Sequence, residues 1–504
     1  MHYVAGTVPK TKIPTNPLAI YTPICQLNTC CVRTIAKNLV NDVQLHSLGC
    51  ESHQYSPLCK ACTEANGERK SDITWSEACN LVTITDTKYG KRAIAQYAWA
   101  EDPKIKFSIS NFQSAKKFAI REHKSLIAKF GKEKGIGIIT NQVEKYKKTG
   151  AYKILSKEEV SKVFLQPHHF IRTSLIENAR SKSTPLRTIL DPSSYVEECQ
   201  SSFNANLLTL PTKQTNSSFI LLGFLLYEFP LSQDIESAFH GTKIIPSDQL
   251  FQLILTFDFS KENWMEHPLI IKVLTLIFGS AQSPTLMEIT IRKICSFLKP
   301  PYNNMLKYQR MVDNILTSFR TIPELKTAEQ TFDNILKEYG FTLKPSDSIE
   351  SVTGTKLDKG EEMEQLLGVN WNKKLDKIGP NYNLNISKKI RGSHKLSNLQ
   401  EIDLETIPIT KRILARIKAQ IYDPLGIFSS NWIIAFKIAY HKACKLLPHD
   451  KDYDTPIKLH DSQLHSHILS LFRKLLHLDK SQYIDRAILK ANEYATTLFI
   501  AVDG

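Results

Sequence analysis

Two aspartates that are far apart in the sequence each lie beside strongly apolar residues. Asp234 follows the mostly apolar run 219–229, and Asp313 lies between the apolar pairs 311–312 and 315–316. Burying a carboxylate costs free energy unless it is paired or binds a cation. Two such sites could converge in an α+β domain on one metal site, as two-metal nucleotidyl transfer requires. The alternative is a pair of ordinary turn or capping aspartates, which the spacing alone favours.

The balance of charge indicates the class of partner. The chain has 504 residues, a net charge of +15 and a pI of about 9.1. Such an excess favours a partner with a phosphate backbone, because each neutralised phosphate releases counterions; the alternative is a basic protein that gains only solubility. No apolar run is long enough to span a membrane, and residues 1–12 lack the apolar core of a signal peptide. We therefore expect an intracellular protein of two to four domains without a membrane partner.

Cysteines are concentrated near the start, where seven of the ten lie within the first 80 residues. Cys59 and Cys62 have the spacing of half a zinc site, and Cys50 or Cys79 could supply a further ligand. Only one such pair is present, so zinc is weakly supported, and free thiols are the favoured state. We assign 1–90 to a Cys-bearing region.

The periodicity of apolar residues predicts several helices. Residues 114–130 form an amphipathic pattern with lysine and arginine between the apolar positions. A second helix is expected over 327–339, ended by Gly340, and two more over 411–421 and 431–447. We expect an α-rich N-terminal extension with a basic helical linker over 91–160.

Two short motifs resemble those of a known enzyme family. Asp234-Ile-Glu-Ser-Ala-Phe239 and Met311-Val-Asp-Asn314 resemble the first and second catalytic motifs of reverse transcriptases. The block from Ile409-Thr-Lys-Arg to Ile421-Tyr-Asp-Pro-Leu-Gly-Ile-Phe-Ser429 resembles, almost residue for residue, the Pao-type block of BEL/Pao LTR retrotransposons, sometimes labelled a Pao peptidase region. Further blocks agree in their order; they span 163–171, 183–193, 202–211, 276–284 and 364–372.

The resemblance covers roughly residues 50–504 and implies a fold. It implies a right-hand polymerase of the α+β class, with fingers and palm over 161–345 and a thumb and connection region over 346–490. Residues 491–504 resemble the opening strand of an RNase H domain. The implied activity is RNA-directed DNA polymerase in a retrotransposon polyprotein. Its cofactor would be Mg²⁺ or Mn²⁺, and its partners an RNA/DNA template–primer duplex and deoxynucleoside triphosphates.

The resemblance also implies roles for individual residues. Asp234 and Asp313 would hold the metal, assisted by the backbone carbonyl of Ile235. The residues implied to contact the incoming nucleotide are Arg187 and Lys182 for the triphosphate, Phe239 for the sugar, and Gly279. Leu367, Gly368 and Trp371 would belong to a hairpin that grips the primer, with an ordinary hairpin core as the alternative. His168 and His169 are expected on a structural strand of the fingers, because neighbouring side chains on a strand point to opposite faces.

One departure from the family pattern bears on activity. Asn314 stands where reverse transcriptases usually carry a second aspartate, so the site loses one negative charge and its metal affinity should fall. The alternative function is therefore a catalytically impaired or inactive remnant that still binds nucleic acid. A protease-bearing fragment is a further alternative, which the missing Asp-Thr-Gly or Asp-Ser-Gly signature argues against.

Overall fold

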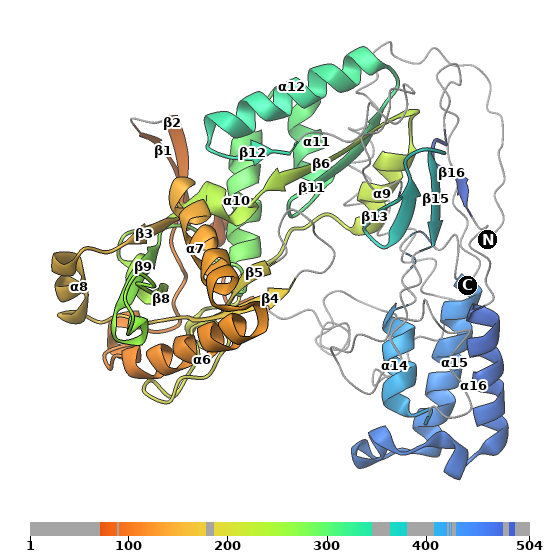
Figure 1. Ribbon diagram of the computed structural model, residues 1–504. Coiled ribbons are helices and arrows are strands. Elements are labelled where there is room, and N and C mark those ends of the chain that lie inside the picture. The colour runs from red at the N-terminus through yellow and green to blue at the C-terminus, as the bar shows by residue number, and fades with distance from the viewer. Residues whose placement is uncertain are drawn as a thin grey trace.

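The structure is a computed structural model that describes most of the chain (Figure 1). The described residues are 71–87, 90–177, 186–344, 363–380, 408–420, 423, 425, 430–476 and 483–488. Lys182, the Cys59 and Cys62 pair, and residues 491–504 lie outside them. Helices and antiparallel strands are mixed along the described chain, so the predicted α+β class is confirmed.

The central element is a four-stranded antiparallel sheet with the order β10-β11-β6-β12. Its strands are β6 (Phe229–Glu236), β10 (Arg310–Met311), β11 (Asn314–Phe319) and β12 (Thr342–Leu343). The helices beside it are α9 (Ser217–Leu225), α10 (Ser283–Cys295), α11 (Tyr302–Tyr308) and α12 (Ile322–Glu338). The apolar run before Asp234 thus divides into a buried helix, α9, and the strand β6.

Capping explains where the neighbouring helix α12 begins. Thr321 accepts a hydrogen bond from the backbone of Glu324, whose carboxylate accepts one from the backbone of Thr321. This reciprocal pair satisfies two N–H groups that a helix start leaves unpaired. Gly340 follows the helix with a φ of +84°, in the left-handed region that glycine favours. The helix predicted over 327–339 is confirmed and begins earlier.

A second group of elements precedes the central sheet in sequence. Its helices are α4 (Trp75–Asn80), α5 (Pro103–Lys106), α6 (Phe112–Phe130), α7 (Lys132–Lys148) and α8 (Lys157–Phe164). Its strands are β1 (Val82–Thr87), β2 (Gly90–Ala95), β3 (Tyr152–Ile154), β4 (Arg172–Glu177), β5 (Leu186–Asp191), β7 (Thr242–Ile244), β8 (Leu253–Phe257) and β9 (Pro268–Val273). Short 3-10 helices join these elements at Asn204–Asn206, Ala238–Gly241, Asp248–Phe251 and Trp264–Glu266.

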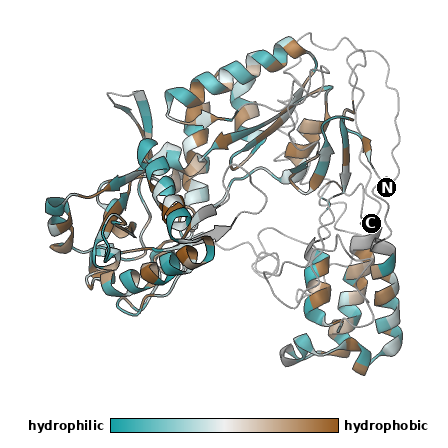
Figure 2. Ribbon diagram, viewed as in Figure 1, coloured by the Kyte–Doolittle hydropathy of each residue, from teal (hydrophilic) through white to brown (hydrophobic). Residues whose placement is uncertain are grey.

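Residues 91–160 do not form a separate linker, which corrects the prediction for this region. Within it, β2 pairs with β7 in parallel and β3 pairs with β9, so strands more than 100 residues apart share sheets. The amphipathic helix predicted over 114–130 is confirmed as α6, and Figure 2 shows its mixture of hydrophilic and hydrophobic residues. His168 and His169 are buried but precede the bridge at Phe170 rather than lying in a strand.

The C-terminal elements form a small sheet and a helical unit. The sheet has the order β13-β14-β15-β16, with β13 (Met363–Leu366), β14 (Val369–Asn372), β15 (Lys377–Pro380) and β16 (Ile484–Asp485). The helical unit packs around its own apolar core and comprises α14 (Lys411–Gln420), α15 (Ser430–Leu446), α16 (Ser462–Leu476) and the 3-10 helices Asp450–Asp454 and Ile457–Leu459. The two helices predicted near 411–421 and 431–447 are confirmed. Among the described helices, none has the length and apolarity required to cross a membrane.

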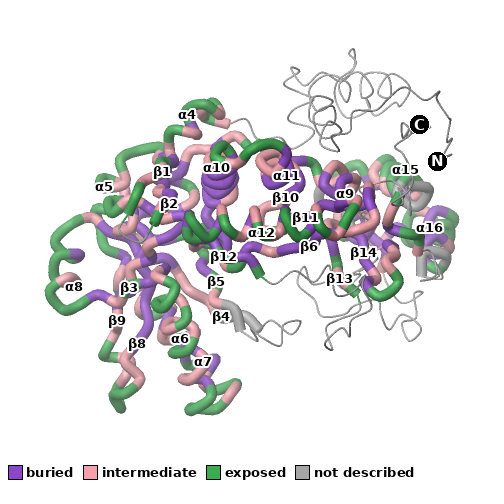
Figure 3. Tube along the Cα trace, turned by 90° about the horizontal axis from the view of Figure 1, so that it is seen from above, coloured by how far each residue is buried: buried purple, intermediate pink, exposed green. Residues whose placement is uncertain are grey.

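One apolar core joins the first two groups of elements. It includes residues from β2, β6, β9, α10 and α12, and Figure 3 shows α10 as largely buried. Within this core, Gln282 at the start of α10 is fully buried. Its side-chain oxygen accepts from the backbone N–H of Ala98 at 3.0 Å, and its amide donates to the carbonyls of Ala98 and Leu208 at 2.8 Å each. This side chain therefore fastens the segment after β2 to α10.

Replacing Gln282 by leucine is expected to lower the free energy of unfolding by about 2–4 kcal/mol, because it leaves the buried N–H of Ala98 without its acceptor and removes a donor from the carbonyls of Ala98 and Leu208. Thermal unfolding of the full chain measures the change. Gln113→Leu, at an exposed position of α6, is the control. An equal effect of the two substitutions would contradict the role given to Gln282.

Candidate active site

The strand register brings the two aspartates to one end of the central sheet. Residues 310–319, named here the Asp313 hairpin, comprise β10 and β11 joined by the turn Val312–Asp313. In the pairing of β11 with β6, Asn314 lies directly opposite Asp234. Asp313, which precedes Asn314 in the turn, is thereby placed beside the end of β6.

Two backbone hydrogen bonds define which groups face the hairpin. The N–H of Ile235 donates to the carbonyl of Asp313 at 2.8 Å, and the N–H of Lys344 donates to the carbonyl of Asp234 at 2.8 Å. The N–H and C=O of one residue in an antiparallel strand point to the same side. The carbonyl of Ile235 therefore faces the Asp313 hairpin. Asp234 and Asn314 form a non-hydrogen-bonded pair, the arrangement that brings opposing side chains closest.

The two carboxylates influence each other electrostatically. Burial raises the pKa of Asp313 above its ordinary value, and the negative charge of Asp234 raises it further. The amide of Asn314 donates to Asp313 Oδ1 at 3.2 Å. The ammonium group of Lys344 forms an ion pair with Asp234 Oδ2, although more than half of the lysine side chain is exposed. An internal cation thus already neutralises one of the two carboxylates.

A buried charge network holds the Asp313 hairpin against α10. Arg310 is 2% exposed, forms an ion pair with Glu288 of α10, and donates to the carbonyl of Val312 in the turn. Glu288 also pairs with Arg292 at 2.5 Å, and Arg292 donates to the carbonyl of Lys213 at 2.6 Å. Because Glu288 is shared between two arginines, its charge is well compensated although it is buried. Arg310 thus holds the turn that carries Asp313 against α10.

A second cluster lies after the end of β6. Phe239 is buried in the 3-10 helix Ala238–Gly241, and its ring meets that of Phe278 edge-on at 4.7 Å. Phe278 is 44% exposed and precedes Gly279. The structure thus brings together Phe239 and the Gly279 loop, two elements that the sequence had predicted for the nucleotide.

Gly279 requires its lack of a side chain. Its φ is +89°, and a Cβ atom there would lie 2.9 Å from the carbonyl oxygen of Leu190 and from Pro192. Asn204 secures the loop, donating to the carbonyl of Gly279 and accepting from the N–H of Ala281, both at 2.9 Å. The loop therefore lies against the end of β5. Strand β5 carries Arg187 opposite Ile176 of β4, whereas the Arg187 side chain and all of Lys182 are outside the described structure.

The protein hairpin that was predicted to grip the primer packs against α9 and the Asp313 hairpin through an apolar cluster. Residues 363–372, named here the Gly368 hairpin, comprise β13 and β14 joined by Leu367 and Gly368, whose φ values are +42° and +97°. Trp371 is fully buried, lies 5.1 Å from the Phe224 ring, and shares an apolar cluster with Leu316 of β11. Its burial leaves Trp371 a role in holding the hairpin rather than in touching a primer.

The donors at the end of β6 are oxygen atoms. Asp234 and Asp313 supply carboxylates, Asn314 supplies a neutral amide oxygen, and Ile235 supplies a carbonyl on the same side. Such oxygen ligands are those that Mg²⁺ and Mn²⁺ prefer. Across the described residues, however, no group of three or more His, Cys, Asp or Glu side chains is arranged to hold a metal ion. The donor set therefore consists of two carboxylates and two neutral oxygens.

Sequence reasoning missed three charged residues that form ion pairs in or beside the central sheet. Lys344 and Glu288 lie outside the quoted motifs, and Arg486 lies in the last described segment. The only signal for Glu288 was a carboxylate within an otherwise largely apolar stretch of helix, which predicts a buried ionic partner. Lys344 and Arg486 carried no local signal, because their partners are more than 100 residues away.

No protein-family model matches the sequence, and no curated protein sequence matches it. The chain is similar to a solved structure of the foamy viral protease–reverse transcriptase in complex with double-stranded DNA. The identity is 14% and the TM-score 0.41, and the match covers 67% of this chain and 48% of the viral chain. The chain thus spans about half the length of the viral protein that it matches.

Replacing Asp313 by asparagine is expected to stabilise the folded protein at neutral pH. Because the folded-state pKa of Asp313 is raised above 3.8, ionising this carboxyl costs folding free energy, and the cost is fully present above the raised pKa. As the pH falls towards the unfolded-state value, the carboxyl becomes protonated in both states and the cost disappears. The unfolding temperature of the variant minus that of the natural chain should therefore increase as the pH rises from about 4 to 8.

The matched control for this titration is Glu101→Gln, at an exposed position. A rise with pH in the Asp313 variant beyond that of this control would assign the cost to the Asp313 carboxyl. A flat profile for the Asp313 variant would mean that its carboxyl is not desolvated in the folded state.

Proposed function

We propose that this chain carries a polymerase site of the reverse-transcriptase type, which adds deoxynucleotides to a primer 3′-hydroxyl as directed by a template. The observation that carries the proposal is the register of β6 with the Asp313 hairpin, which gathers two carboxylates at one strand end. The second support is the position of Phe239 and Gly279 on the segments that follow β6 and β9. The net charge of +15 suits a nucleic-acid partner.

Each residue of the site would have a separate role in the reaction. Asp234 and Asp313 would hold Mg²⁺ or Mn²⁺, which supplies activation of the 3′-hydroxyl and charge stabilisation at the leaving pyrophosphate. Arg187 would grip the triphosphate through its planar fork of donors, with Lys182 as a second cation. Phe239 would exclude a 2′-hydroxyl by the bulk of its flat ring. Gly279 would let the backbone approach the nucleotide closely.

A finer assignment rests on the sequence motifs. The resemblance of 409–429 and of the ordered blocks before it supports a BEL/Pao-type retrotransposon polyprotein as the source of the domain. On that assignment the template is RNA, and the fingers and palm occupy 161–345 and the thumb and connection 346–490. The protein would act inside the cell, in a cytoplasmic particle or in the nucleus.

A second candidate function is nucleic-acid binding without catalysis. Two observations favour it: Asn314 supplies no charge at the position opposite Asp234, and Lys344 already pairs with that aspartate. Both lower the net negative charge available to a divalent cation. The excess of lysine and arginine, a net charge of +15, would remain able to bind a phosphate backbone.

Replacing Asn314 by aspartate is expected to raise primer extension about tenfold or more at limiting Mg²⁺, because it adds a carboxylate opposite Asp234 where hard cations prefer one. The assay follows incorporation of a labelled deoxynucleotide on a primed RNA template, with Mg²⁺ or Mn²⁺. Asp234→Asn is the inactive control. Activity only in the Asn314 variant would favour a decayed enzyme. Salt-sensitive template binding without extension by either protein would favour the binding function.

Replacing Lys344 by methionine is expected to tighten Mn²⁺ binding about fivefold, because the lysine and the metal compete for Asp234 and an exposed ion pair is worth at most about 1 kcal/mol. Electron paramagnetic resonance of free Mn²⁺ measures the affinity without any turnover. Lys337→Met, at an exposed position of α12, is the matched control. Unchanged affinity in the Lys344 variant would show that the ion pair does not limit metal binding.

A further inference from the structure

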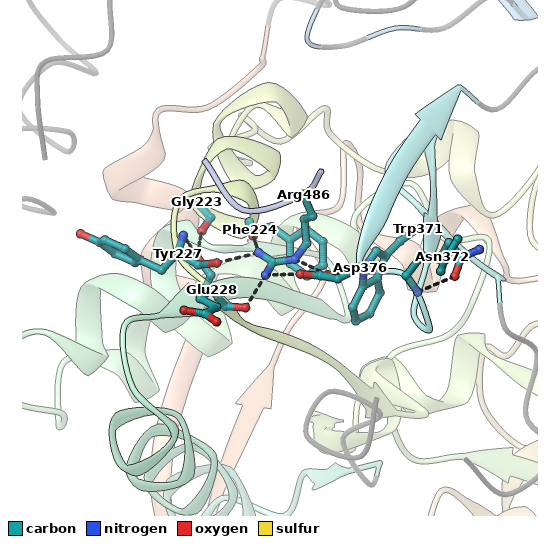
Figure 4. A network of polar contacts seen from close by, with 10 residues as sticks. Gly223, Phe224, Tyr227, Glu228, Trp371, Asn372, Asp376 and Arg486 are labelled. Atoms are coloured by element: carbon teal, nitrogen blue, oxygen red, sulfur yellow. Dashed lines mark hydrogen bonds and ion pairs between the residues drawn. The ribbon is translucent and has the colours of Figure 1, made fainter. Parts of the chain in front are cut away.

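Arg486 is the most completely bonded cation among the described residues, and no role is yet assigned to it. Its side chain is fully buried, although it follows the helical unit in sequence. Figure 4 shows its guanidinium surrounded by oxygen atoms from Asp376 and from the backbone near Tyr227. A buried charge is costly unless it is paired and hydrogen-bonded, so this environment must be specific to arginine.

One half of the environment is the entrance to β6. Arg486 donates to the carbonyls of Phe224 and Tyr227 at 2.7 Å each, and to that of Glu228 at 2.5 Å. These residues end α9 and lead into the strand that carries Asp234. The last carbonyls of a helix have no partners within the helix and carry partial negative charge, so a cation there is favourable.

The other half is the turn that follows the Gly368 hairpin. Arg486 binds both oxygens of Asp376, with Nε–Oδ1 at 2.7 Å and Nη2–Oδ2 at 2.9 Å. Asp376 also accepts the indole N–H of Trp371 at 2.9 Å. The five N–H groups of the guanidinium are thereby used by five acceptors.

The backbone around Arg486 repeats the same connection. Its N–H donates to the carbonyl of Asp376 at 3.0 Å, and the N–H of Ile488 donates to that of Leu225 at 2.8 Å. The preceding strand β16 pairs with β15, with Ile378 opposite Ile484. Residues 483–488 therefore lie between the segment 224–228, which leads into β6, and the turn and strand β15 that follow the Gly368 hairpin, and they bind to both.

We propose that Arg486 is a positioning residue that sets the place of the Gly368 hairpin relative to β6, and so holds a primer 3′ end in line with Asp234 and Asp313. This inference rests on the proposed function. It makes residues 483–488 part of the polymerase unit, although the helices α14–α16 separate them in sequence from the palm. The arginine acts through Asp376 and Trp371 and does not touch the primer itself.

The test compares Arg486→Met and Arg486→Lys with the natural chain in primer extension. For Arg486→Met, the KM for a recessed primer–template should rise about tenfold, which corresponds to about 1.4 kcal/mol, while kcat changes much less. Arg486→Lys keeps the positive charge but not the planar fork of donors, so its KM should lie between those of the natural chain and Arg486→Met. A role in folding alone would reduce the active fraction, and hence the apparent kcat, without moving KM; that result would overturn the proposal.

Arg412→Met is the matched control. Arg412 of α14 also makes a two-point ion pair, with Asp454, but that pair is exposed. Its removal should leave the KM unchanged. Asp376→Asn offers a second route to the same outcome if the Arg486 variants fold poorly, because it weakens the same link while leaving the arginine bonded to three carbonyls.

A binding measurement separates failure of this inference from failure of the proposed function. If neither the natural chain nor Asn314→Asp extends a primer, the polymerase proposal fails. The ratio of the Kd values for recessed and blunt duplexes, from fluorescence anisotropy, still reports on primer-end positioning. Loss of this preference in the Arg486 or Asp376 variants, with blunt-duplex binding retained, would support the inference. An unchanged ratio, or no preference in the natural chain, would overturn it.

Discussion

The pairing of β6 with β11 determines the geometry of the site. With Asn314 opposite Asp234, both aspartates lie at the same strand end, and the carbonyl of Ile235 faces the Asp313 hairpin. A shift of one residue would turn every side chain of the strand to the other face of the sheet. The register is held by apolar packing of Leu316 on one side of the sheet and by the buried pair of Arg310 with Glu288.

Charge compensation at this strand end is local and incomplete. Glu288 is shared by two arginines, which fixes the hairpin turn in place. Asp313, in contrast, has its pKa raised by burial and by Asp234, and the ion pair of Lys344 is formed with Asp234. Lys344 therefore offsets one of the two negative charges at this strand end, and a third carboxylate is absent at Asn314. The same residues therefore belong to both proposed functions, catalysis and nucleic-acid binding without catalysis.

Periodicity predicted the helices well but not how segments join. The helices α6, α12, α14 and α15 were expected close to their observed positions, because an amphipathic pattern is a local property of the sequence. The region 91–160 was wrongly separated from the core, because β2 and β3 find partners in β7 and β9 more than 100 residues later. For Trp371 a grip on the primer and an ordinary hairpin core were both considered, and its burial against Phe224 fits the hairpin core.

The sequence by itself determined where the helices α6, α12, α14 and α15 form and where the two aspartates stand beside apolar residues. Those features depend on neighbouring residues, so they are encoded locally. Only the tertiary structure decided that Lys344 neutralises Asp234 and that Arg486 joins the start of β6 to Asp376. The residues next to a lysine or arginine in the sequence do not indicate which distant group it will pair with. Its partner is set by which distant backbone and carboxylate groups the folded core brings within reach.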